Sequence, residues 1–200
     1  MVASVRDDLL AAGLAAFERD GFERATVAAI RTRARASNGS FFHVFASKKE
    51  LAGTLVLEML QRYHAAIVAA LDPRLSARVG IERLIRAHLD WVVQSRREAR
   101  YLFEISRSEW AEDVREEQRA QNARLVDGIE RWRAPLLASG ELLPMTPAMF
   151  ISQLIGPAQV LCRAYLSAAT TAIRGCRPIR SSPARSLRLS RRRRARKHGD

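Results

Sequence analysis

The chain has 200 residues, of which 48% are hydrophobic and only 6% are aromatic. This length fits one domain or two small ones, and a composition rich in Ala, Leu and Arg predicts an all-α protein. Every apolar stretch is interrupted by charge before about 18 residues, which argues against a membrane span. Two cysteines are too few for a disulfide framework, so a reduced, cytoplasmic location is expected. Met1 leads directly into a charged amphipathic segment that lacks the pattern of a secretory signal.

The positive charge is concentrated at the C-terminal end. The net charge is +13, but residues 174–200 hold 11 Arg or Lys and one acidic residue, a net of +10 that leaves +3 for residues 1–173. A segment dominated by Ser, Pro, Gly and Arg cannot bury enough apolar surface to fold, so we expect a disordered basic tail. Such a tail can add salt-dependent, nonspecific affinity for nucleic acid, or it is an unstructured end with no role of its own.

The first predicted helix covers residues 6–20, where apolar side chains recur with helical spacing. Gly21 ends this pattern, because a helix often closes on a left-handed residue that glycine adopts freely. Phe22 is then expected to pack back onto the helix.

Three more helix starts follow closely. Thr26 and Ser37 each precede a short apolar pattern and can accept a hydrogen bond from a free backbone N–H of the following turn. Ser47 is followed three residues later by Glu50, the pattern of a capping box. Three capped starts with almost no loop between them predict a helix-turn-helix whose second helix begins after Ser37.

The segment from residue 6 to residue 55 resembles the TetR/AcrR family of bacterial transcriptional regulators, in register and without a gap. The residues that carry the resemblance are Ala16-Phe17, Gly21-Phe22, Thr26-Val27, Ile30, Ala34, Ser37, Gly39, Phe41-Phe42-His43-Val44-Phe45 and Ser47-Lys48-Lys49-Glu50-Leu51. The resemblance implies a three-helix DNA-binding head at residues 1–47, a helical ligand-binding and dimerisation domain at residues 48–173, and regulation of transcription. The rest of the chain matches this family only in the number and style of its helices.

The helix after Ser37 is expected to present Asn38, Gly39 and Ser40 to base edges in a major groove, with Asn38 as the best base reader because its amide can pair with adenine. In the family register, Thr26, Ser37 and Lys48 lie where backbone phosphates are held. Phe42 and His43 are expected to point outward, His43 as a DNA contact rather than a metal ligand. Taken singly, the capping residues can equally be no more than caps.

The chain departs from the family pattern at a few positions. Phe42 replaces the usual Tyr and loses a hydroxyl that can reach phosphate, at a cost of about 1 kcal/mol. Arg35 stands where the family prefers Gly, so a left-handed conformation there would carry about 1 kcal/mol of strain. Ala36 replaces a larger aliphatic residue and should under-fill the head. Arg31, Arg33 and Arg35 either grip phosphates or form a solvated basic face.

Further helices are predicted over residues 48–71, 75–96, 98–106, 110–138 and 147–171. Pro135 should kink or split one of them, and Gly156-Pro157 interrupts the apolar run of the last. The helix after Ser47 belongs to both domains and is expected to link them mechanically. The family usually dimerises through its last two helices. Here only the helix over 147–171 is available, with Gly156 and Ala158 allowing close approach of a second copy.

The resemblance also implies a small-molecule pocket among the helices between residues 75 and 171. Candidate lining residues are Trp91, Tyr101, Phe103, Trp110, Trp132, Phe150, Gln153 and Cys162. The alternative is that most of these side chains are ordinary core. His88, on an apolar face, is expected to be a core histidine with its hydrogen bonds satisfied.

The sequence shows no phosphate-binding glycine loop, no nucleophile elbow and no Cys or His cluster at metal spacing, so we expect no enzyme activity, no cofactor and no metal. The predicted function is that of a homodimeric repressor that binds double-stranded operator DNA and is released by a small-molecule effector. One alternative is a helical small-molecule-binding or scaffolding protein with a degenerate head. Another is a general nucleic-acid binder driven by the tail.

Overall fold

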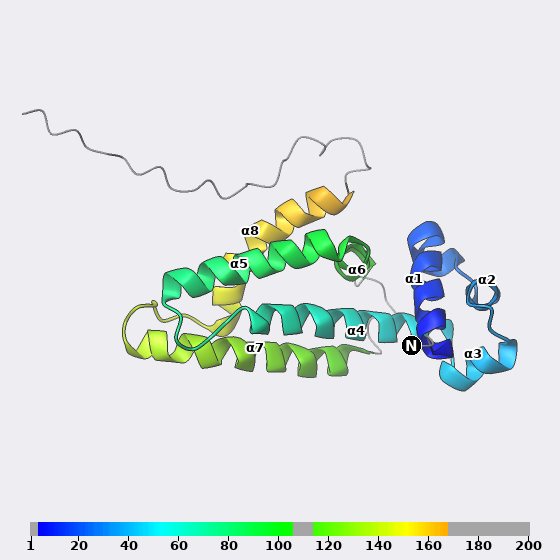
Figure 1. Ribbon diagram of the computed structural model, residues 1–200, viewed down its shortest axis with the longest axis horizontal. Coiled ribbons are helices and arrows are strands. Elements are labelled where there is room, and N and C mark those ends of the chain that lie inside the picture. The colour runs from blue at the N-terminus through cyan, green and yellow to red at the C-terminus, as the bar shows by residue number, and fades with distance from the viewer. Residues whose placement is uncertain (1–3, 106–113, 168–200) are drawn as a thin grey trace, which may run out of the picture. The chain divides into compact units, whose positions relative to one another are not determined.

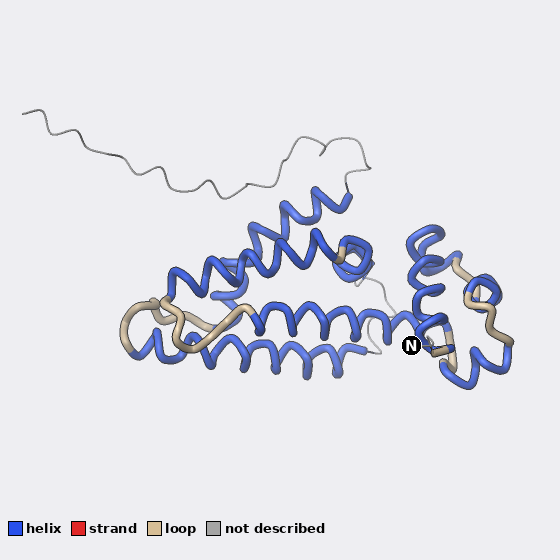
Figure 2. The backbone as a smooth tube through the Cα atoms, viewed as in Figure 1, coloured by secondary structure: helices blue, strands red, loops and turns tan. Residues whose placement is uncertain are grey.

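The computed structural model describes residues 4–105 and 114–167, so the candidate Trp110 and the basic tail lie outside the described residues. The helices run in the order α1 (Val5–Arg24), α2 (Val27–Arg33), α3 (Asn38–Val44), α4 (Lys48–Ala69), α5 (Ala77–Gln94), α6 (Arg96–Arg100), the π-helix η1 (Tyr101–Ile105), α7 (Arg115–Ala138) and α8 (Pro147–Ser167). Figure 1 shows α4 lying alongside α7, and α5 alongside α8. The described part of the chain contains no strand (Figure 2), which confirms the predicted all-α class.

The predicted capping residues begin their helices as expected. Thr26 Oγ1 accepts from the Ala29 amide at 3.2 Å, and Ser37 Oγ accepts from the Ser40 amide at 3.0 Å. Ser47 Oγ accepts from the Glu50 amide at 3.1 Å. The Glu50 carboxylate accepts from the Ala46 amide, one residue before the cap, so the predicted capping box closes only on its serine side. Local side-chain chemistry thus sets where each helix of the head begins.

Gly21 interrupts α1 with φ 77° and ψ 163°, a conformation that an L side chain rarely adopts. The chain bends at Gly21, and α1 continues for three more residues to Arg24. The ring of Phe22 turns back toward Phe17, with ring centroids 5.6 Å apart. The predicted role of Gly21 is confirmed.

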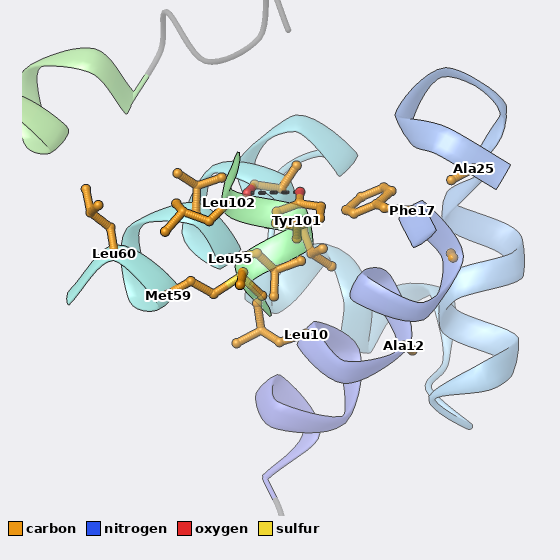
Figure 3. Packing of buried hydrophobic residues seen from close by; sticks show 14 of the residues in the cluster. Leu10, Ala12, Phe17, Ala25, Leu55, Met59, Leu60, Tyr101 and Leu102 are labelled. Carbon is orange, nitrogen blue, oxygen red and sulfur yellow. Dashed lines mark hydrogen bonds between the residues drawn. The ribbon is translucent and has the colours of Figure 1, made fainter. Parts of the chain in front are cut away.

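The main hydrophobic cluster passes from the head into the larger helical domain. It includes Phe17 of α1, Leu55 of α4 and Tyr101 of η1, all buried. Figure 3 shows Tyr101 directed toward Phe17, and the two rings stack at 5.9 Å. At the surface, Arg97 of α6 forms a two-pronged ion pair with Glu18 of α1, with distances from 2.5 to 3.1 Å. The head therefore packs on the larger domain through α1 as well as through the continuous α4.

A second cluster fills the opposite end of the helical domain. Its buried members are Ile67, Ala77, Leu84, Ile129, Trp132, Leu136 and Phe150. Trp132 also donates its indole N–H to the carbonyl of Leu75 at 3.1 Å, which ties α7 to the loop before α5. Each end of the domain thus has its own apolar centre.

Neither Pro135 nor Pro157 splits its helix. The helix α7 continues through Pro135 to Ala138, and α8 continues through Gly156-Pro157 to Ser167. A proline removes one backbone donor, but the neighbouring turns and the packed faces of these helices hold the helical path. The segment predicted as one helix over 98–106 is instead the short α6 followed by the π-helix η1.

Candidate nucleic-acid interface

The short helix α3 is held in place by two phenylalanines on its inner side. Phe41 is fully buried and Phe45 is 3% exposed, with ring centroids 6.2 Å apart. Ile30 of α2 is fully buried in the same cluster. A seven-residue helix is too short to be stable alone, so these anchors fix its position and its rotation.

The opposite side of α3 is open to solvent. Asn38, Gly39 and His43 are exposed, and the ring of Phe42 is 50% exposed while it stands edge-on to Phe41. Ser40 is half-buried, and its hydroxyl lies 2.8 Å from that of Ser37. The two serine hydroxyls are therefore hydrogen-bonded to each other. Asn38 and His43 are left as the polar side chains of this edge that extend into solvent.

The ammonium group of Lys48 is hydrogen-bonded within the protein. Its ammonium group donates to the carbonyls of Phe22 at 2.7 Å, Glu23 at 3.2 Å and Ala25 at 2.9 Å. It also lies 4.4 Å from the centre of the Phe22 ring. An ammonium group has three donors, and all three are taken by the carbonyls that follow the bend in α1. The side chain predicted to hold DNA thus caps the C-terminal end of α1 from the start of α4, because a cation at that end complements the helix dipole.

Arg35 in the turn between α2 and α3 adopts φ 55°, the only positive φ at a non-glycine among the described residues. This is the left-handed conformation that was considered for Arg35 because the family prefers Gly at this position. Arg33 and Arg35 are exposed and line a hollow beside Asp8 and Ala15 of α1, whereas Arg31 is half-buried. The structure thus combines a polar recognition edge with a basic turn.

The residues proposed for a ligand pocket do not come together at one place. Trp91 and Phe103 pack 6.2 Å apart beside Tyr63, whereas Trp132 and Phe150 pack 6.0 Å apart in the second cluster. Of the other three described candidates, Cys162 lies with the first group, beside His88. Tyr101 and Gln153 lie apart from both groups, since Tyr101 faces the head and Gln153 is exposed.

A polar chain runs through the first aromatic group. The Tyr63 hydroxyl lies 2.9 Å from His88 Nδ1, and Cys162 Sγ lies 3.5 Å from His88 Nε2. His88 is fully buried, as expected of a core histidine, and burial lowers its pKa. Burial also raises the pKa of the Tyr63 hydroxyl and of the Cys162 thiol, so all three groups are held neutral. Tyr63 could not be predicted as the partner of His88 from sequence, since it lies 25 residues earlier in the chain.

Comparison with known proteins identifies the head. Residues 9–55 match the model of the bacterial regulatory proteins of the TetR family, which covers α1 to the start of α4. Residues 9–55 thus have the sequence pattern of a TetR-family DNA-binding head. This match supports a DNA-binding transcription regulator with a helix-turn-helix.

Solved structures share the TetR-family fold well beyond the head. A protein from Shewanella sp. PV-4 assigned to the tetR family of transcription regulators is 23% identical, with a TM-score of 0.68 over 82% of this chain and 86% of its own. A tetR-family regulatory protein from Rhodococcus RHA1 is 19% identical, with a TM-score of 0.64 over 81% and 85%. The fatty acid degradation regulator FadR from Bacillus halodurans is 13% identical, with a TM-score of 0.64 over 83% and 86%. At these identities the likeness establishes the fold. No curated protein sequence matches the chain.

In the described part of this chain, no three His, Cys, Asp or Glu side chains gather as metal ligands would. None of the described helices is both long enough and apolar enough to cross a bilayer.

Proposed function

We propose that this protein is a homodimeric repressor that reads an operator through α3 and is released from it by a small molecule. The observation that carries the DNA-reading part is the division of α3 into two sides. Phe41 and Phe45 are buried, while Asn38 and His43 are exposed. A recognition helix needs this arrangement, because its polar edge must enter a major groove while its base stays fixed.

Within this proposal Asn38 reads a base, and the neighbouring arginines neutralise phosphates. Operator sites are first selected from random duplex DNA with the full chain. Asn38→Ala should then lose the difference between operator and random DNA, because an amide paired with adenine is worth about 1–3 kcal/mol of discrimination. Arg33→Ala is the matched variant, and it should weaken binding to both DNAs alike. If Asn38→Ala discriminates as the parent does, the assignment of Asn38 is wrong.

The dimer is proposed to form through α8. Val160 is 68% exposed, Leu161 is 69% exposed and Met149 is 53% exposed, an unusual share of apolar surface for one helix. A Cβ added to Gly156 would meet no atom within 4 Å, so a partner helix can approach closely there. A second copy of the chain would cover these side chains and set two recognition helices about 34–36 Å apart, one turn of DNA.

Effector release is proposed to act through α4. This single helix has Leu51 and Ala52 buried beneath the head, and His64 and Ile67 buried in the helical domain. A small apolar or amphipathic molecule that prefers one arrangement of α4 would change the spacing of the two heads and lower operator affinity. Addition of effector to a preformed operator complex should free the DNA in a gel-shift assay.

One observation favours a second candidate, a small-molecule-binding or scaffolding protein with a degenerate head. The ammonium group of Lys48 is occupied within the protein. A gel shift against the upstream DNA of its own gene, repeated at rising salt, separates the two candidates. Specific, salt-sensitive binding supports the regulator, and its absence supports the scaffold.

A further inference from the structure

Two glycines bring α4 and α7 into close contact at two places along their length. A Cβ on Gly53 of α4 would lie 2.5 Å from Val114 Cγ1, just before α7. A Cβ on Gly128 of α7 would lie 2.6 Å from Val68 Cγ2 of α4. At both positions a Cβ atom would overlap the valine methyl group, so only glycine fits. The two contact points on α4 are about 22 Å apart at the helical rise per residue.

Between these contacts the two helices leave a cavity of about 250 Å³ that is open to solvent, since Gln61, Ala65 and Arg124 in its lining are exposed. Its lining residues are Gln61, His64, Ala65, Val68, Gln121, Arg124 and Leu125. Engineered apolar cavities of about 150 Å³ hold a benzene ring, so this space holds a molecule of about ten non-hydrogen atoms. None of the aromatic residues proposed from the sequence lines it.

The cavity wall contains two polar atoms that are not satisfied. The Nδ1 of His64 and the Oε1 of Gln121 are buried and have no partner in hydrogen-bond geometry among the described residues. Each such atom costs about 1–3 kcal/mol, and native structures seldom keep two side by side without a ligand or a water molecule to pair with them. His64 itself is only 9% exposed, so the surrounding protein cannot easily rotate it into solvent.

The charge of the wall narrows the class of ligand. Burial lowers the pKa of His64 to about 4, so the imidazole is neutral at pH 7. Of the seven lining residues, Arg124 alone is then charged, which disfavours a cationic ligand. Ala65, Val68 and Leu125 supply apolar surface for the body of the molecule.

We propose that the α4–α7 cavity binds a small, uncharged, largely apolar molecule whose hydroxyl or N–H group donates to His64 and Gln121. Its effect on DNA rests on the proposed function, because α4 also carries the head. A ligand seated between the two glycine contacts bears on α4 directly.

The experiment compares indole with indene, which has the same ring skeleton but carries a CH₂ group where indole has its N–H. Each is titrated into the full chain in the absence of DNA and followed by calorimetry and by amide chemical shifts. Indole should bind at least about tenfold more tightly, since one hydrogen bond to an otherwise unpaired acceptor is worth about 1.4 kcal/mol. Equal affinity for the two, or no binding of indole, overturns the proposal; the latter result leaves the space to ordered water.

Two variants locate the site. Ala65→Trp fills the cavity from an exposed position and should abolish indole binding, whereas Ala69→Trp, on the same helix but outside the lining, should leave it unchanged. Gln121→Leu removes one unpaired oxygen and should shrink the preference for indole over indene several-fold. Parent-like affinity in Ala65→Trp would place indole elsewhere and overturn the proposal. Because binding is read without DNA, a failure of operator binding or release is seen separately in the gel shift.

Discussion

Replacing Lys48 by Met removes the ammonium group and keeps the apolar stem. Two of its three carbonyl bonds, to Phe22 and Ala25, are partly buried, and the third, to Glu23, is exposed. With about 1.5 kcal/mol for each partly buried charged bond and less for the exposed one, the free energy of unfolding should fall by about 3 kcal/mol. The cation–π contact with Phe22 adds to this loss. For a chain of this size the melting temperature should drop by roughly 10 °C.

The assay pairs thermal unfolding with the salt dependence of operator binding. Because Lys48 donates to three carbonyls within the protein, Lys48→Met should have a lower melting temperature. The dependence of operator affinity on salt concentration should be unchanged when it is measured at a temperature where the variant is folded. Arg33→Met is the control, since it removes the same charge from the head without uncapping α1. The reasoning would be refuted by a parent-like melting temperature together with a salt slope reduced by about one, which is the signature of a lost phosphate contact.

Three further perturbations test other parts of the structure. Arg35→Gly relieves the left-handed strain at φ 55° and should raise stability by about 1 kcal/mol in urea unfolding, whereas Arg33→Gly, inside α2, should lower it. The pKa of His64 falls from 6.5 unfolded to about 4 folded, so the unfolded chain binds more protons between these values. Stability should therefore decline as pH falls through this window, by about 3 kcal/mol at most, and His64→Gln should flatten the profile in urea titrations. Leu161→Arg places charge on exposed apolar surface of α8 and should yield monomers in sedimentation experiments, with a melting temperature that no longer rises with protein concentration.

The head could be predicted from sequence because its determinants are local. The caps at Thr26 and Ser37 act within three residues, and the inner face of α3 follows from the spacing of Phe41 and Phe45. The left-handed backbone at Arg35 was foreseeable only from the glycine that the family prefers there. Short-range chemistry therefore specified the recognition helix and its orientation.

What depends on distant partners could not be predicted. The acceptors of Lys48 lie 23 to 26 residues away, on a bend whose carbonyls the sequence does not reveal. The candidate pocket residues were grouped by chemistry, but Trp91 and Trp132 pack into different clusters. The cavity between α4 and α7 arises from two backbone approaches, which sequence periodicity does not encode. Pro135 does not split its helix, because α7 continues to Ala138.

The apolar cluster shared by α1, α4 and η1 limits how this regulator can be recombined with its relatives. The stacking of Tyr101 on Phe17 and the ion pair of Arg97 with Glu18 join the head to a segment far along the chain. A chimera that grafts residues 1–47 onto another body would keep Phe17 but lose the aromatic ring that covers it. A chimera that exchanges DNA specificity between relatives should therefore include α6 and η1 together with the head. The segments to be exchanged are then not continuous in sequence.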